Sequence, residues 1–220
     1  SSMLGISWSP IKLPSLLHWY RFDNGITVDA SNDVTKWEDQ KGSNHLTATG
    51  VAANSPLYSS GAVMFNAAAD IMTFTTAPDL AEFSIYMRSE SDDLGTSADE
   101  TLMENGSSIF IRITATSQSR VKWDGERNDF TFSPALTKNT KFNYGLERDN
   151  DGDIELYIDG STDIVTKTGS NNHNIATSAT FELATLGQPA LTSKFYEIVI
   201  CNNSLSSTDR ELLNTYLNAI

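Results

Sequence analysis

The fold is decided by residues 142–160, which read FNYGLERDNDGDIELYIDG. Residues 142–146 and 154–158 are rich in aromatic and aliphatic side chains, and in the first segment apolar and small or polar residues alternate. Such alternation is typical of a strand with one buried face. Asp151-Gly152 and Asp159-Gly160 tolerate the positive φ that tight hairpin turns require. The stretch therefore predicts two antiparallel strands joined by a turn, with a second turn after them.

The same pattern of short apolar runs and turn dipeptides continues along the chain in both directions. Further strands are expected at residues 63–65, 71–74, 83–87, 109–113, 121–123, 130–132, 181–186 and 195–200, and further turns at Asn24-Gly25, Asn105-Gly106 and Asp124-Gly125. Long helical patterns do not alternate with these runs, so a parallel sheet built from βαβ units is not favoured. The sequence predicts an all-β antiparallel fold.

The C-terminus changes from a strand period to a helix period. Apolar residues at 212, 213, 216, 217 and 220 follow the stripe of an amphipathic helix. Ser206, with Asp209 three residues later, resembles a capping box. We therefore expect a helix over about residues 207–218 that packs on the sheet. By contrast, residues 89–100 read as an acidic, exposed loop.

The composition is acidic and rich in neutral polar side chains. The chain has a net charge of −13, and 66 of its 220 residues are Ser, Thr or Asn. Nucleic acids and anionic membrane surfaces need a basic footprint, so neither is expected as a partner. The single cysteine, Cys201, excludes an internal disulfide. No apolar run reaches the ~18 residues of a membrane helix, and the N-terminus lacks the features of a signal peptide.

The chain contains, in this order, the motifs LLHWYRF at 16–22, NGIT at 24–27, VTKWEDQKGSNHL at 34–46, GAVMF at 61–65, LYIDG at 156–160, YEIVI at 196–200 and LSSTDRE at 205–211. Together these motifs resemble those of concanavalin A-like (laminin-G-like) jelly-roll domains. The resemblance implies a two-sheet antiparallel jelly-roll sandwich over residues 14–220, preceded by an N-terminal extension at 1–13, with Trp19 and Trp37 in its core. Such domains include lectins, glycosidases, adhesion modules and phage virion proteins, so the fold does not select a function.

Five carboxylates stand close together in the sequence, at Glu147, Asp149, Asp151, Asp153 and Glu155. Glycoside hydrolysis needs two carboxylates that flank the bond. The segment DGDIE at 151–155 is the nearest match to the laminarinase-like pattern, but its first Asp falls in a turn, and we expect no catalytic residue. Asp149, Asp151 and Asp153 are weak candidates for calcium ligands, since their spacing departs from that of an EF-hand loop. The alternative is a solvated turn, and no other cofactor is expected.

The segment WDGERND at residues 123–129 combines an aromatic ring with polar groups in one predicted hairpin. A sugar presents an apolar face that stacks on a ring and hydroxyls that need polar partners. Trp123 is the candidate platform, and the candidate hydroxyl partners are Asp124, Arg127, Asn128 and Asp129. The alternative places Trp123 at the end of a core strand and leaves the rest as a polar turn.

Two classes of function follow from these observations. The favoured one is non-catalytic recognition of a glycan or cell-surface polysaccharide, in an adhesion or lectin-like module. The second is a structural phage virion component, such as a decoration, fibre or tail protein, whose partners are other virion proteins. A glycosidase is the least favoured. We expect the protein at a virion or extracellular surface, and exposed edge strands leave oligomers open.

Overall fold

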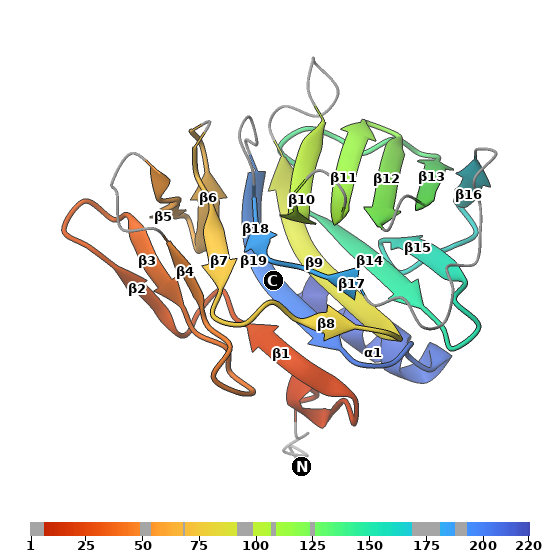
Figure 1. The fold of residues 1–220 in the computed structure, drawn as a ribbon, viewed down its shortest axis with the longest axis horizontal. Coiled ribbons are helices and arrows are strands. Elements are labelled where there is room, and N and C mark those ends of the chain that lie inside the picture. The colour runs from red at the N-terminus through yellow and green to blue at the C-terminus, as the bar shows by residue number, and fades with distance from the viewer. Residues whose placement is uncertain are drawn as a thin grey trace, which may run out of the picture.

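Two antiparallel β-sheets, one of seven and one of ten strands, form the layers of a sandwich (Figure 1). The computed structural model describes residues 7–48, 54–67, 69–91, 99–106, 109–123, 126–168, 181–187 and 193–220. A short 3-10 helix, η1 (Pro10–Lys12), precedes the first strand, and an α-helix, α1 (Ser207–Asn218), ends the chain. The expected all-β, two-sheet antiparallel sandwich with a C-terminal helix is confirmed.

The long strand β19 (Ser193–Cys201) organises the seven-stranded sheet. The order is β15 (Ile154–Ile158), β14 (Phe142–Arg148), β9 (Phe83–Ser91), β19, β6 (Ala62–Phe65) and β5 (Leu57–Ser59), and β1 (Leu16–Tyr20) also pairs with β19. β6 pairs with the start of β19 and β1 with its end, while β9 runs along its other side. The hairpin of residues 142–160 forms one edge of this sheet, as β14 and β15.

The ten-stranded sheet contains most of the shorter strands. Its order is β16 (Val165–Thr168), β13 (Glu126–Phe132), β12 (Gln118–Trp123), β11 (Ile109–Ala115), β10 (Glu100–Asn105), β18 (Thr185–Leu186), β7 (Met72–Phe74), β4 (Leu46–Ala48), β3 (Val34–Trp37) and β2 (Ile26–Val28). Two further strands, β8 (Asp79–Leu80) and β17 (Phe181–Glu182), pair only with each other. In β11, Ile111 and Ile113 are buried while Arg112 and Thr114 are not, so the strand follows the alternation expected of one covered face.

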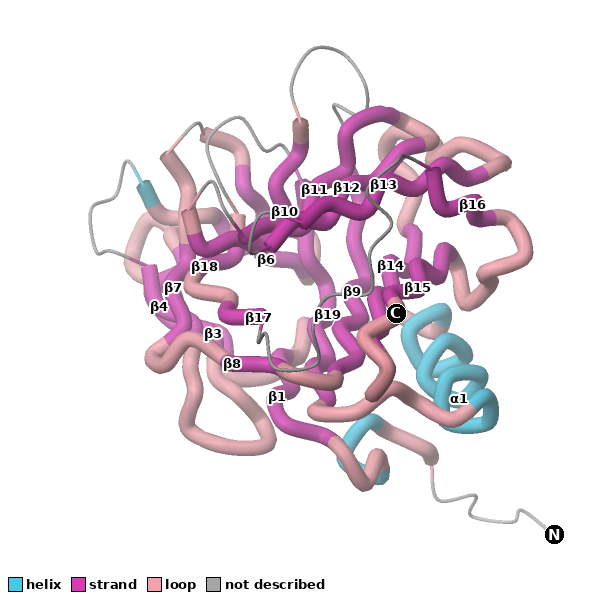
Figure 2. The backbone as a smooth tube through the Cα atoms, turned by 45° about the vertical axis from the view of Figure 1, so that its right-hand side comes forward, coloured by secondary structure: helices cyan, strands magenta, loops and turns pink. Residues whose placement is uncertain are grey.

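The seven-stranded sheet is covered on both faces. Its inner face packs against the other sheet, with Ile85 and Met87 of β9 in the main core. On its outer face, Tyr86 of the same strand packs in a second cluster that includes Trp19, Leu213 and Leu217. Figure 2 shows α1 against this sheet, away from β10–β13. No helix among the described residues is long and apolar enough to cross a membrane.

The local signals at the turns and the helix start are confirmed. Gly152 and Gly160 have φ values of 84° and 83°, as the two Asp-Gly turns require. The helix begins after Ser206, whose hydroxyl accepts a hydrogen bond from the backbone N–H of Asp209. Cys201 is free and buried, within the second cluster.

Two expectations about elements are wrong in part. Residues 181–186 do not form one strand, since β17 and β18 join different sheets. Residues 89–100 are not all loop, because Ser89 and Ser91 end β9 and Glu100 begins β10, and all three side chains are buried. The intervening residues 92–98 lie outside the described part of the chain. Strands are predicted from short runs of apolar residues, and this rule misses β10 because the strand begins and ends with polar residues. Those polar residues gain partners only in the folded sheet.

Candidate functional site

The predicted sugar-binding segment does not present all its side chains on one side. Arg127 and Asp129 lie on the outer face of β13, whereas Asn128 is fully buried and stands opposite the core residue Val121. This split follows from the strand geometry, because successive side chains point to opposite faces. The side chain of Trp123 and the whole of Asp124 lie outside the described residues.

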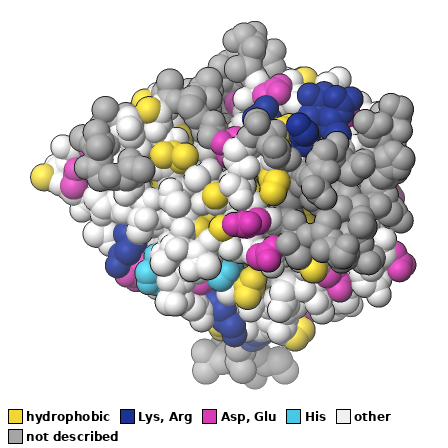
Figure 3. All heavy atoms as spheres, in the orientation of Figure 1, with side chains coloured by type: hydrophobic (Ala, Val, Ile, Leu, Met, Phe, Trp, Pro, Cys, Tyr) yellow, Lys and Arg dark blue, Asp and Glu magenta, His cyan; other side chains and the backbone are white. Residues whose placement is uncertain are grey.

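The sheet register brings three further cations beside Arg127 and Asp129. Arg112 of β11 stands directly opposite Arg120 of β12, and Arg120 stands opposite Asp129 of β13. In the neighbouring row, Lys122 stands opposite Arg127. Arg112, Arg120, Lys122 and Arg127 thus share one outer face, which we call the β11–β13 basic face. Figure 3 shows Lys and Arg side chains gathered over these strands.

Asp129 connects two of these arginines. The Nε atom of Arg120 donates a hydrogen bond of 2.7 Å to Oδ1 of Asp129, and Nε of Arg127 lies 3.0 Å from Oδ2. The side chains of Arg120, Arg127 and Asp129 are 33%, 45% and 20% exposed. Among the described residues, the terminal guanidinium nitrogens of both arginines have no partner. One carboxylate thus holds two guanidinium groups by their Nε atoms, and their terminal N–H donors remain unused.

Arg112 is held in a different way. Its guanidinium carbon lies 3.9 Å from the centre of the Phe110 ring, a cation–π arrangement that covers the ring. Its terminal nitrogens lie 3.7 Å from carboxylate oxygens of Asp99 and Glu104, beyond normal hydrogen-bond length. Phe110 is only 6% exposed, so it offers no open stacking platform.

A hollow of about 120 Å³ lies beside the Arg120–Asp129 pair on this sheet. Besides these two residues, its lining includes Thr114, Gln118, Thr131 and Thr168. Hydroxyl and amide groups both donate and accept hydrogen bonds, as sugar hydroxyls do. The hollow therefore combines neutral hydrogen-bonding groups with a carboxylate and a guanidinium, a set suited to a polar, hydroxyl-rich ligand.

Part of this face can be predicted from the sequence. The polar residues of β11 and β12 alternate with core residues, which predicts that Arg112 and Arg120 point outward. What sequence reasoning missed is that these residues stand opposite one another and beside Asp129, because register depends on pairing between separate segments. Arg112, Arg120, Lys122, Gln118 and Thr168 were therefore absent from the predicted set.

The carboxylates of residues 147–155 do not converge on one point. Oδ1 of Asp149 accepts hydrogen bonds from the backbone N–H groups of Asp151 and Asp153, which shapes the turn. Asp153 forms an ion pair of 2.7 Å with Lys167. Among the described residues, no group of three or more His, Cys, Asp or Glu side chains could hold a metal ion. The geometry gives no support to calcium at Asp149, Asp151 and Asp153.

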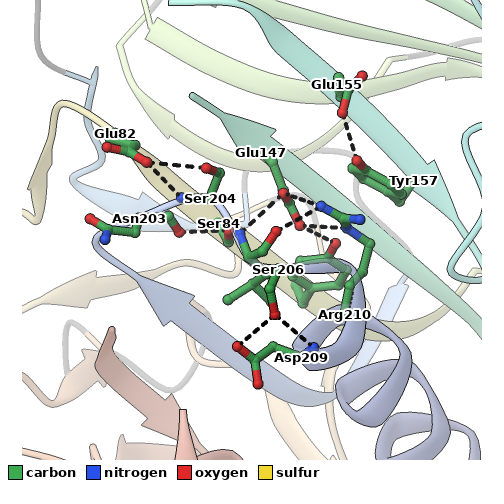
Figure 4. A network of polar contacts seen from close by, with 12 residues as sticks. Glu82, Ser84, Glu147, Glu155, Tyr157, Asn203, Ser204, Ser206, Asp209 and Arg210 are labelled. Atoms are coloured by element: carbon green, nitrogen blue, oxygen red, sulfur yellow. Dashed lines mark hydrogen bonds and ion pairs between the residues drawn. The ribbon is translucent and has the colours of Figure 1, made fainter. Parts of the chain in front are cut away.

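Glu147 and Glu155 belong to a network beneath α1 (Figure 4). Oε1 of Glu147 accepts hydrogen bonds from the Tyr86 hydroxyl at 2.6 Å and from Nε of Arg210 at 2.9 Å. Its Oε2 accepts from Nη2 of Arg210 at 2.9 Å. Glu155 accepts a hydrogen bond from the Tyr157 hydroxyl, and the Arg210 guanidinium stacks over the Tyr157 ring. The network joins the helix to the sheet and uses carboxylates for structure.

Comparison with known proteins supports the β-sandwich fold but does not assign the chain to a family. No family model matches the chain, and no curated protein matches it. The chain is similar to a solved structure of Trypanosoma rangeli sialidase in complex with sialic acid, at 14% identity and a TM-score of 0.60, covering 93% of this chain and 33% of that one. It is also similar to the botulinum neurotoxin serotype D ligand binding domain in complex with N-acetylneuraminic acid, at 14% identity and a TM-score of 0.59, covering 93% of this chain and 51% of that one.

The chain spans about a third of the sialidase chain and about half of the neurotoxin chain. At this level of identity, the likeness shows the fold alone. The β-sandwich part of the predicted resemblance is confirmed, whereas membership of the concanavalin A-like family and a link to phage proteins stay predictions.

Proposed function

We propose that this protein is a non-catalytic glycan-recognition module whose ligand binds on the outer face of β11–β13 and β16. The observation that carries the proposal is the polar hollow beside Arg120 and Asp129, lined by Gln118, Thr131 and Thr168. Similar solved structures include proteins in complex with sialic acid and N-acetylneuraminic acid, which is consistent with a sugar ligand for this sandwich.

The carboxylate count at the hollow supports binding over hydrolysis. Hydrolysis of a glycosidic bond ordinarily needs two carboxyl groups, about 5–10 Å apart, on either side of the bond. The described lining of the hollow holds a single carboxylate, Asp129, and two guanidinium groups already engage it. The similar structures include both an enzyme and a ligand binding domain, so the fold itself does not decide between these roles.

The test is binding to a broad panel of immobilised glycans, followed by titration of the best ligand. The double variant Gln118→Ala/Thr168→Val removes hydrogen-bonding groups from the hollow and is expected to weaken that binding at least tenfold. Lys36→Ala is the matched control, since Lys36 is a partly exposed residue on the distant strand β3 of the same sheet. The absence of any glycan signal would contradict the proposal, and release of reducing sugar would contradict its non-catalytic part.

The role of a virion protein that binds protein neighbours stays the alternative function, and a virion or extracellular surface is the proposed location for either role. The virion-protein role predicts a different outcome of the same measurements: no glycan binding, together with capture of a virion protein or self-association. Light scattering after size-exclusion chromatography reports self-association directly.

A further inference from the structure

We infer that the β11–β13 basic face selects a glycan bearing an anionic group, carboxylate or sulfate, which binds the terminal nitrogens of Arg120 and Arg127. The inference rests on the proposed function and specifies its ligand class. It is drawn from the donors that Asp129 leaves unused and from the charges in the two rows beside it.

The hydrogen-bonding capacity of the two arginines favours an acceptor. A guanidinium has five N–H donors and no acceptor. Asp129 contacts the Nε atom of each arginine, so among the described residues the four terminal nitrogens of Arg120 and Arg127 remain available at a partly exposed surface. Hydrogen bonds from a guanidinium to an ionised oxygen are about twice as strong as neutral ones and are often bidentate. A carboxylate or sulfate matches this donor set better than a hydroxyl does.

The charge pattern of the face points the same way. Four of the 15 lysines and arginines of an otherwise acidic chain occupy two adjacent rows of three strands. Arg112 and Arg120 stand directly opposite each other, an arrangement of like charges that destabilises a sheet. A purely structural ion pair needs one arginine for Asp129, whereas this face supplies two. A bound anion offsets the repulsion between the opposed guanidinium groups of Arg112 and Arg120.

The acidic character of the whole chain limits the anions that fit. At physiological salt, the field of exposed charges decays over about 8 Å, so the basic face acts on a group in contact with it. A long polyanion would also meet the negative surface of a chain with a net charge of −13. This favours a glycan with one or a few anionic groups at the contact over a nucleic acid.

Arg120 is also the residue that joins the two parts of the site. It lines the hollow with Asp129 and Thr168, and its Nε is fixed by Asp129. A ligand that places a sugar ring in the hollow therefore meets the Arg120 guanidinium at its edge. The hollow would contact hydroxyls, and the two arginines would contact the acidic substituent.

The test compares matched ligands that differ only in the charge of the acidic group. Titration calorimetry compares sialyllactose with its uncharged methyl ester, and sulfated lactose with lactose, and so separates carboxylate from sulfate as the preferred anion. The protein is expected to bind at least one acidic ligand tenfold or more tightly than its neutral counterpart, and this preference should shrink as salt is raised from 50 to 500 mM. In Arg120→Ala/Arg127→Ala the preference should disappear, while Lys36→Ala retains it.

The conservative pair Arg120→Lys/Arg127→Lys tests the guanidinium geometry. It preserves the charge but removes the planar guanidinium group with its paired N–H donors, so it should keep less than a third of the preference for the acidic ligand. Full retention of that preference would contradict the assignment of the anion to the guanidinium groups. Equal affinity for acidic and neutral ligands would overturn the inference while leaving glycan recognition standing. Failure to bind any ligand on the glycan panel would instead contradict the proposed function. Circular dichroism confirms that each variant is folded.

Discussion

The two outer faces of the sandwich use charged side chains in opposite ways. On the seven-stranded sheet, Glu147 is 3% exposed beneath α1 and accepts hydrogen bonds from Tyr86, Arg210 and the Leu205 backbone. On the ten-stranded sheet, Arg120 and Arg127 share one carboxylate at the surface, and their terminal donors have no partner among the described residues. On the first face the charges of Glu147 and Arg210 are satisfied within the protein, and on the second the terminal donors of two arginines are available for a ligand.

The difference follows from what covers each face. A buried charge is tolerated only when its partners satisfy it, because desolvation costs several kcal/mol per ion. The helix brings Arg210 to Glu147 and thereby closes that face. Over β11–β13, solvent compensates for incomplete pairing, so an excess of cations costs little stability. Three predictions test whether the two faces differ as this comparison states.

The largest effect on stability is expected at Glu147. The variant Glu147→Gln removes the charge but nearly keeps the volume, and it leaves Arg210 without its ion-pair partner. Breaking a buried pair in this way costs about 3–5 kcal/mol. Urea denaturation followed by tryptophan fluorescence measures the loss in the free energy of unfolding.

The matched control for that variant is Glu38→Gln, since Glu38 forms an exposed ion pair with Lys36 at 2.6 Å. An exposed pair contributes about 0–1 kcal/mol. If the two variants lost equal stability, the contrast between covered and open charges would be wrong.

The second effect depends on pH and involves Glu197, which is fully buried beneath α1. Its Oε1 accepts hydrogen bonds from Nε1 of Trp19 at 2.7 Å and from the Tyr216 hydroxyl at 2.5 Å. Burial raises the pKa of Glu197 to about 7, against an ordinary value of 4.5, while the hydrogen bonds from Tyr216 and Trp19 and the charge of Arg21 oppose the rise. The folded protein therefore holds a proton that the unfolded chain releases.

The sign of the pH dependence follows from this raised pKa. The stabilising contribution is fully present below pH 4.5 and is lost as the pH rises through 7, by about 3 kcal/mol in total. Glu197→Gln keeps an acceptor for Trp19 and Tyr216 but does not titrate. Relative to the native protein, it should gain about 3 kcal/mol of stability between pH 4.5 and pH 9. Denaturation curves at several pH values test this, and parallel curves for the two proteins would contradict it.

The sequence predicts those features that depend on neighbours along the chain. The turns at Gly152 and Gly160 and the cap at Ser206 follow from local pattern, and the structure confirms them. The core positions of Trp19 and Trp37, which the family resemblance implies, are confirmed as well. Period-2 alternation also separates Asn128 from Arg127 and Asp129, a consequence that a list of sugar-binding residue types overlooks. The pairing of Arg112 with Arg120 depends on the register between strands. No local rule supplies that register, so three of the four cations of the β11–β13 basic face, Arg112, Arg120 and Lys122, are not predicted.

The smallest effect on stability is expected at the basic face, where binding is expected to change most. In Arg120→Ala/Arg127→Ala, the lost contacts are two partly exposed ion pairs with Asp129, at 2.7 and 3.0 Å. Such pairs contribute about 0–1 kcal/mol each, and removal of two cations also relieves their repulsion with Arg112 and Lys122. The free energy of unfolding should therefore fall by less than about 1 kcal/mol, measured in urea at 0.15 M salt beside Glu147→Gln. A loss as large as that of Glu147→Gln would mean that the two arginines serve the fold, as Arg210 does, and would remove the reason to assign their free donors to a ligand.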